Sequence, residues 1–143
     1  MNMKRIVFFI LMVVMATAAH AQDSQQPFKG HFVNEEYHVY MRIDLHSDGF
    51  DIPDHELYGP LPGFLAKERN GFYWVITSAE ILSDTQAEIE LINDFGSEDL
   101  KATLTLEDNG STLVLKQGEG STIKVPKDGK WMKLPSKLTF TRK

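Results

Sequence analysis

The chain has 143 residues, of which 24% are charged and 42% hydrophobic, and it has no cysteine. This composition predicts one folded domain and excludes disulfides, zinc–thiolate sites, iron–sulfur clusters and a cysteine nucleophile. The net charge of −5 argues against a general nucleic-acid-binding protein.

The first 21 residues have the pattern of a secretory signal peptide. Lys4 and Arg5 precede an uninterrupted apolar run over residues 6–15, and small residues at Ala19 and Ala21 mark a cleavage point before Gln22. The run is too short for a membrane-spanning helix, and no later stretch is long enough either. We therefore expect a mature chain exported to the periplasm or the cell exterior, with a flexible leader over residues 22–27 and one domain over residues 28–143.

The mature sequence alternates apolar and polar residues with a period of two, which is typical of strands with one buried face. In residues 37–46, the odd positions are apolar and the even positions polar. The same alternation recurs in residues 87–91, 100–107, 122–125 and 137–141. No segment of the mature chain repeats apolar residues at helical spacing convincingly. The sequence therefore predicts an all-β fold.

Turn signals separate these strands. Asn70-Gly71 and Asn109-Gly110 are typical of two-residue hairpins, in which both residues accept a positive φ. Short hairpins join antiparallel neighbours, so we expect a meander of eight to ten strands. Closure removes exposed strand edges. The prediction is an antiparallel up-and-down β-barrel rather than a sandwich, because nearly every connection is short.

Two segments depart from the alternation. Residues 53–63 contain three prolines and two glycines, and we expect a loop over one end of the barrel that acts as a lid. Residues 72–82 are apolar on both faces. One face would meet the barrel interior, and the other a loop, a terminus or a partner.

The two ends of the domain resemble those of lipocalins. Gly30 and Phe32 stand where that superfamily has a Gly-x-Trp motif, and Arg142 stands where it has a late arginine that packs over the tryptophan. Residues 93–100 and 130–135 are similar to segments of small secreted lipocalin-like (calycin-type) proteins of gut Bacteroidetes. The resemblance implies a barrel whose closure involves Gly30, Phe32 and Arg142, and an envelope location. It implies no reaction.

Lipocalin-type barrels hold small apolar ligands in the lumen, so the first hypothesis is a carrier of a small hydrophobic ligand or lipid. Aromatic and thioether side chains suit such a lumen or its mouth. The candidates are Tyr37, Met41, Tyr58 and Trp74. The alternative is a protein-interaction or inhibitor module with a packed core, which exposed Tyr73 and Val75 would support.

Catalytic and metal-binding patterns are weak. Ser97 lies outside any G-x-S-x-G motif, so we expect no enzyme, no catalytic residue and no cofactor. An enzymatic alternative would need a cleft that joins a histidine such as His46 or His55 to acids. Histidines and acids are dense over residues 46–56 but match neither an EF-hand nor H-E-x-x-H, and we interpret them as solvated turn residues rather than a metal site. The members of this run are His46, Asp48, Asp51, Asp54, His55 and Glu56.

Positive charge gathers near the C-terminus. We interpret this charge as part of a solvated surface of both signs. The alternative is a basic rim of Lys127, Lys130, Lys133 and Lys137 that binds an anionic partner such as a lipid headgroup or an acidic glycan. Trp131 stands between two of these lysines. It would either supply an aromatic platform or plug the end of the barrel.

Overall fold

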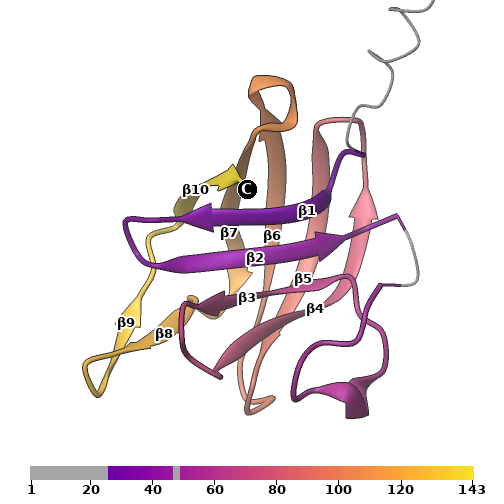
Figure 1. Cartoon of the computed structure of the whole chain (residues 1–143). Coiled ribbons are helices and arrows are strands. Elements are labelled where there is room, and N and C mark those ends of the chain that lie inside the picture. The colour runs from indigo at the N-terminus through magenta and orange to yellow at the C-terminus, as the bar shows by residue number, and fades with distance from the viewer. Residues whose placement is uncertain (1–25, 47–48) are drawn as a thin grey trace, which may run out of the picture.

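The computed structural model describes residues 26–46 and 49–143, so the predicted signal peptide, residues 22–25 of the leader and Asp48 lie outside the described residues. The described residues form strands joined mostly by short turns, with a long loop before Gly63 and two single-turn 3-10 helices, η2 (Glu56–Tyr58) and η3 (Asp108–Gly110) (Figure 1). The strands are β1 (Lys29–Asn34), β2 (Val39–Asp44), β3 (Gly63–Lys67), β4 (Tyr73–Ile81), β5 (Gln86–Asn93), β6 (Asp99–Glu107), β7 (Thr112–Gly120), β8 (Lys124–Lys127), β9 (Lys130–Lys133) and β10 (Lys137–Arg142).

Eight of these strands close into an antiparallel barrel in the order β1-β10-β7-β6-β5-β4-β3-β2. Strands β1 to β7 follow one another around the wall, and β10 pairs with β7 on one side and β1 on the other. The remaining two, β8 and β9, form a separate hairpin inserted between β7 and β10. This arrangement confirms the predicted all-β meander barrel and adds one excursion to it.

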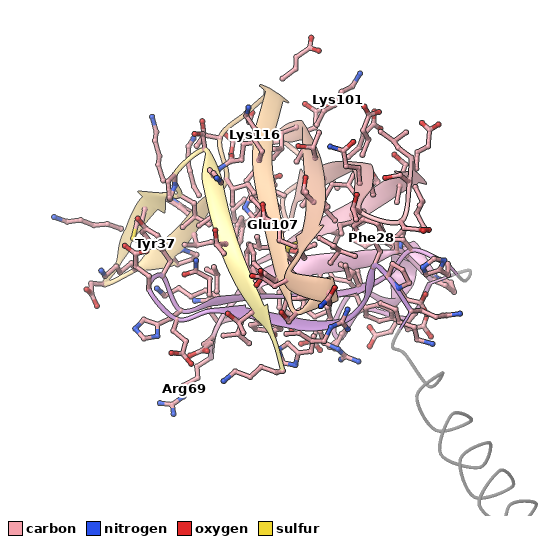
Figure 2. All side chains as sticks on the ribbon, turned by 90° about the horizontal axis from the view of Figure 1, so that it is seen from above. Phe28, Tyr37, Arg69, Lys101, Glu107 and Lys116 are labelled. Carbon is pink, nitrogen blue, oxygen red and sulfur yellow. The ribbon has the colours of Figure 1, made fainter. Side chains whose placement is uncertain are left out.

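The period-two alternation places one side of each strand inside the barrel. On β5, Ala87, Ile89 and Leu91 are buried, whereas Glu88 and Glu90 are exposed. The same pattern holds along β2, β6 and β10. The inward side chains form one cluster that includes Phe28, Phe32, Met41, Trp74, Leu104 and Phe140, all fully buried. Figure 2 shows these side chains together with the outward ones, seen from above.

The two predicted hairpin turns differ in geometry. Asn109 and Gly110 both have positive φ values, of 58° and 86°, which confirms the prediction for that turn. In the other turn, the residue with positive φ is Arg69 (58°) rather than Asn70. The Asn70 side chain instead accepts a hydrogen bond from the Phe72 N–H at 2.8 Å, which is the local Asx bond that asparagine favours in turns.

The loop before β3 covers the outer wall of the barrel rather than its end, so its prediction as a lid was wrong. Ile52, Phe50 and Leu61 pack on side chains that β3 and β4 direct outward. Those outward side chains are Phe64, Ala66, Tyr73 and Val75, all buried. The outer face of β4 is therefore apolar because the chain's own loop covers it, which is one of the three coverings expected from the sequence.

The β8–β9 hairpin closes one end of the barrel. Val125 and Leu134 are buried in the interior cluster, together with Ile123 just before β8. Gln117 on β7 holds both ends of the excursion. Its side-chain oxygen accepts a hydrogen bond from the Ile123 N–H at 2.7 Å, and its amide nitrogen donates to the Pro135 carbonyl at 2.9 Å.

Candidate functional site

The four candidate lumen residues do not form one group. Met41 and Trp74 are fully buried within the interior cluster, and Tyr37 packs against that cluster while partly exposed. Tyr58 lies elsewhere, in η2 on the outer loop, with 52% of its surface exposed. Because Met41 and Trp74 are fully buried in one cluster with the other inward side chains, the interior resembles a packed core rather than a ligand cavity.

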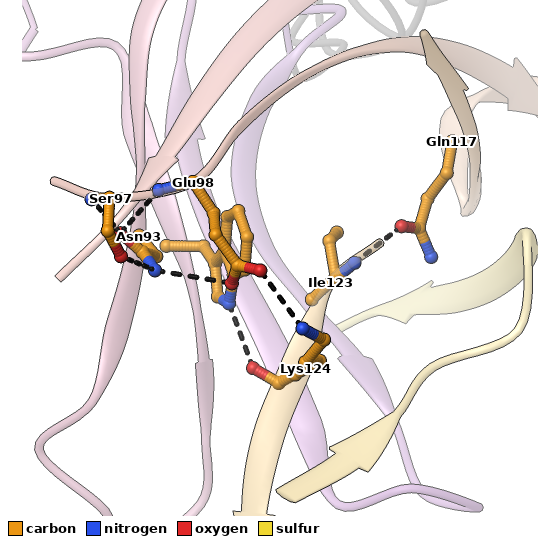
Figure 3. A network of polar contacts seen from close by, with 7 residues as sticks. Asn93, Ser97, Glu98, Gln117, Ile123 and Lys124 are labelled. Atoms are coloured by element: carbon orange, nitrogen blue, oxygen red, sulfur yellow. Dashed lines mark hydrogen bonds and ion pairs between the residues drawn. The ribbon is translucent and has the colours of Figure 1, made fainter. Parts of the chain in front are cut away.

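Trp74 links the interior to the hairpin. Its indole N–H donates a hydrogen bond to the Lys124 carbonyl at 2.9 Å (Figure 3). A buried indole needs such a partner, because an unpaired N–H in an apolar interior is costly. Trp74 therefore holds β8 across the end of the barrel.

Gly30, Phe32 and Arg142 meet at the seam where the barrel closes. The Arg142 guanidinium lies over the Phe32 ring, 4.5 Å from its centroid. Its Nε donates to the Gly110 carbonyl at 2.9 Å and its Nη1 to the Lys29 carbonyl at 2.6 Å. A side chain at Gly30 would collide with the guanidinium, and Gly30 has a φ of 148°. One cation thus ties β1 and β10 to the turn between β6 and β7.

His55 fastens the outer loop to the turn after β5. Its side chain is only 8% exposed and stacks on Tyr73, with ring centroids 5.0 Å apart. Nδ1 lies 2.9 Å from the Pro53 carbonyl, and Nε2 contacts the Asp94 carboxylate. Both partners are acceptors, so the doubly protonated imidazolium satisfies both bonds. Burial alone would lower the pKa of His55, but the bonds to Pro53 and Asp94 outweigh it, so the pKa is raised.

This contact predicts a pH-dependent contribution to stability. A histidine whose folded pKa is raised stabilises the fold fully below its unfolded pKa of about 6.5, and that stabilisation is lost as pH rises through the folded value. We expect Asp94→Asn to lower the free energy of unfolding more at about pH 5.5 than at about pH 8.5. Urea unfolding of both proteins at the two pH values measures this difference.

The comparison between variant and parent isolates His55. His31 has a lowered pKa, first because it is partly buried and then because Arg42 and Lys143 are near, so its linkage has the opposite sign. That contribution is present in both proteins and cancels. An equal loss of stability at both pH values would contradict the assigned role of His55.

Three aromatic rings meet beside the β8–β9 hairpin. Trp131 on β9 lies 4.8 Å from Phe72 and 6.4 Å from Phe95, measured between ring centroids, and Phe72 lies 5.4 Å from Phe95. Phe72 is buried, whereas Phe95 is 73% exposed and Trp131 53% exposed. We call these three rings the aromatic corner. Trp131 therefore does not plug the barrel end, which Ile123, Val125 and Leu134 fill.

A polar network adjoins the aromatic corner (Figure 3). Asn93 is buried, and its side-chain oxygen accepts hydrogen bonds from the backbone N–H groups of Ser97 and Glu98 at 2.9 and 3.2 Å. Its amide nitrogen donates to the Ser97 hydroxyl and the Glu98 carboxylate. Glu98 pairs with Lys124 at 2.9 Å, and both side chains are about one-third exposed. Asn93 thus shapes the turn that places Glu98 and Phe95.

The aromatic corner and the ion pair enclose a hollow of about 180 Å³. Its lining combines apolar rings with hydrogen-bonding groups: Phe72, Asn93, Phe95, Ser97, Glu98, Lys124 and Trp131. These residues come from four separate parts of the chain. Sequence patterns pointed to Trp131 with its lysine neighbours and, separately, to Ser97; no motif marks Phe95, Glu98 or Lys124 as their companions.

Two larger hollows lie on other parts of the wall. One, of about 760 Å³, lies over the outer surface of β4 to β7 and is lined by side chains such as Glu80, Glu88, Lys101 and Lys116. The other, of about 690 Å³, lies along the seam between the β1–β2 turn and β10, and Tyr37 contributes to it. Neither lining combines several exposed aromatic rings with a hydrogen-bonded ion pair, so the smaller hollow is the candidate site.

The histidine- and acid-rich run spreads out in space. His46 contacts the Pro27 carbonyl, whereas His55 contacts Pro53 and Asp94. Among the described residues, no group of three or more His, Asp or Glu side chains is placed so that it could hold a metal ion.

We compared the chain with protein-family models, curated proteins and solved structures, and none of the three comparisons finds a match. No helix within residues 26–46 and 49–143 is long and apolar enough to cross a membrane. The fold and the candidate site define the class: an eight-stranded antiparallel barrel with a packed interior and an aromatic corner at its hairpin-capped end.

Proposed function

We propose that the protein is an exported, lipocalin-like binding barrel, rather than an enzyme, that recognises an anionic partner through the aromatic corner. The observation that carries this proposal is the contact between two exposed rings, Phe95 on the β5–β6 turn and Trp131 on the lysine-rich β8–β9 hairpin. Large exposed apolar surfaces on a folded domain commonly mark interaction sites. Export rests on the sequence pattern of the first 21 residues.

The packed interior favours an outer binding surface over a luminal ligand. Trp74, Phe28, Phe32 and Phe140 fill the barrel, and a lipid in the lumen would have to displace such side chains. Displacing well-packed core groups carries a large energetic cost. A carrier of a small hydrophobic ligand is therefore the less favoured function.

The outer face of β4 is a poorer candidate for a partner surface. Tyr73 and Val75 are buried beneath the loop that carries Ile52 and Leu61. The hairpin, in contrast, carries four lysines, Lys124, Lys127, Lys130 and Lys133, against one acid, Asp128. In a chain of net charge −5, this local excess of positive charge directs an anionic partner to the same end as the exposed rings.

Trp131 provides the test, because the other tryptophan, Trp74, is fully buried. We expect iodide to quench Trp131 fluorescence more strongly than caesium, since the hairpin lysines attract anions. We also expect a polyanion to shift the Trp131 emission and to protect it from quenching. The probes are polygalacturonate, alginate, hyaluronan, heparin, polyglutamate and phosphatidylglycerol vesicles, each titrated at low and at physiological salt.

The matched control is Tyr58→Phe, which alters an aromatic side chain of nearly equal exposure on another part of the surface. It should leave the response unchanged, whereas Trp131→Phe should abolish the fluorescence change. Binding should weaken as salt rises. If none of the six probes changes Trp131 emission or quenching, the proposed function is wrong.

A further inference from the structure

Building on the proposed function, we infer that the hollow at the aromatic corner binds one sugar ring of an acidic polysaccharide. The inference rests on how the hollow combines two kinds of wall. One wall is aromatic, formed by Phe72, Phe95 and Trp131, and the other is polar, formed by Ser97, Glu98 and Lys124. A sugar ring has the matching surfaces, because its C–H groups form an apolar face and its hydroxyls project from the rim.

The aromatic wall is an angled corner rather than a flat stack. Trp131 meets Phe72 at an interplanar angle of 66° and Phe95 at 79°. Edge-to-face packing of this kind holds the rings in position while leaving ring surface in contact with solvent. Phe72 is buried and supports the two exposed rings from beneath. The corner is therefore held ready for a partner that covers Phe95 and Trp131.

The polar wall can both accept and donate hydrogen bonds. Glu98 uses one oxygen for Lys124 and the other for Asn93, and each carboxylate oxygen can accept more than one bond. Lys124 uses one of its three N–H donors on Glu98. A carboxylate and an ammonium 2.9 Å apart can bind two neighbouring hydroxyls, one donating to Glu98 and the next accepting from Lys124. Hydrogen bonds to charged groups are also the stronger ones.

The size of the hollow indicates a segment of a longer chain. Pockets for drug-sized ligands span roughly 300–1,000 Å³, whereas this hollow has about 180 Å³. It holds one ring, and the rest of the ligand would lie along the surface. On the hairpin, pairing of Lys124 with Lys133 and of Pro126 with Trp131 places these four residues on one face. Lys133 therefore lies beside Trp131, where it can meet an acidic group on the next sugar.

Glu98 argues against an anionic lipid surface as the partner. A lipid phosphate in the hollow would face the Glu98 carboxylate, and two like charges at close range repel each other. Sugar hydroxyls are neutral, and a carboxylate can accept hydrogen bonds from them. The acidic groups of a polysaccharide can instead lie outside the hollow, at Lys133 and the lysines of the hairpin tip.

The experiment compares polygalacturonate, alginate, hyaluronan and heparin with the neutral polymers dextran and galactan, with polyglutamate and with phosphatidylglycerol vesicles. Calorimetry and Trp131 fluorescence give the affinities. We expect at least one acidic polysaccharide to bind, and to bind about tenfold more tightly than the neutral polymers and polyglutamate. Glu98→Gln should weaken that binding by about tenfold although it removes a negative charge, because the variant loses a charged hydrogen bond to a hydroxyl.

Whether Glu98→Gln weakens or strengthens the binding of the acidic polysaccharide decides between hydrogen bonding and simple charge attraction. For a purely electrostatic interaction, removing an acid from the surface would strengthen the binding of any polyanion. Lys116→Gln, on β7 and outside the lining of the candidate site, controls for the loss of one lysine when compared with Lys124→Gln. The unfolding midpoint of each variant confirms that it is folded.

Two outcomes would overturn the inference while leaving the proposed function in place. In the first, Trp131 responds to vesicles or polyglutamate but to none of the four acidic polysaccharides. In the second, an acidic polysaccharide binds and Glu98→Gln tightens it. A failure of every probe would instead remove the proposed function itself.

Discussion

Replacing Arg142 with alanine is expected to lower the free energy of unfolding by about 3 kcal/mol. The guanidinium contacts the Phe32 ring and donates hydrogen bonds to the carbonyls of Lys29 and Gly110. A cation over an aromatic ring contributes about 0.5–2 kcal/mol, and a hydrogen bond to a charged donor about 1.5–3 kcal/mol. The sum is partly offset because solvent can reach the carbonyls after the substitution.

The expected effect is large because Arg142 stabilises the seam between β1 and β10, and this seam is short. β1 and β10 are in register at two pairs only, Phe32 with Arg142 and Val33 with Thr141. Adjacent strands elsewhere pair over longer stretches, such as Gln86 to Ile92 of β5 on β6. Arg142 therefore adds side-chain hydrogen bonds to a seam with few backbone pairs, as does Asn34, whose amide donates to the Thr139 carbonyl at 3.0 Å. Hydrogen exchange of the β1 amides should accelerate in the variant more than that of the β5 amides.

Arg142→Lys is the informative control. Lysine keeps the charge over Phe32 but cannot reach both carbonyls with one planar fork. We expect the free energy of unfolding of Arg142→Lys, measured by chemical unfolding, to lie between that of the parent and that of Arg142→Ala. Full stability in Arg142→Lys would mean that charge alone, rather than the fork, closes the seam.

Trp74→Ala is expected to destabilise the protein by about 4 kcal/mol, because it removes the largest fully buried side chain of the interior. Trp74 also carries the hydrogen bond to the Lys124 carbonyl, so the hairpin should loosen with the core. Lys124 lines the candidate site, and the variant should therefore also lose any ligand bound at the aromatic corner.

Trp74→Phe separates these two effects. Phenylalanine keeps most of the ring but not the N–H donor, so we expect a loss of about 1–3 kcal/mol from the unpaired carbonyl and the smaller ring. Amide exchange in β8 should rise relative to that in β5 and β6. If β8 exchange is unchanged in Trp74→Phe, the indole bond does not hold the hairpin, and only core packing does.

Periodicity reveals a strand's buried face but does not identify what covers its outer face. Residues 72–82 illustrate this limit. Their apolar character on both sides predicted a covering, and the covering is the loop that carries Ile52 and Leu61. The proline- and glycine-rich composition of that loop indicated irregular backbone. It gave no information about which surface the loop packs on, so the prediction of a lid over the barrel end was wrong.

The lumen candidates show the same limit for side chains. Alternation places Met41 and Trp74 on the inward face of their strands, and both are inside. Whether inward side chains leave a cavity depends on their summed volume against the barrel's diameter, which strand number and tilt set. Here the aromatic side chains of Phe28, Phe32 and Phe140 occupy the interior. No local sequence pattern indicates how the volume of the side chains compares with that of the barrel.

Local sequence patterns were thus sufficient to predict the strands, their buried faces, most of the hairpins and the up-and-down strand order. These features depend on residues close together in sequence. The hairpin cap, the seam held by Arg142 and the candidate site depend on residues that meet only after the barrel closes. Phe72 lies just before β4, Phe95 and Glu98 lie in the β5–β6 turn, and Trp131 lies in the inserted hairpin. Their proximity follows from strand register and closure, which are properties of the whole fold rather than of any one segment.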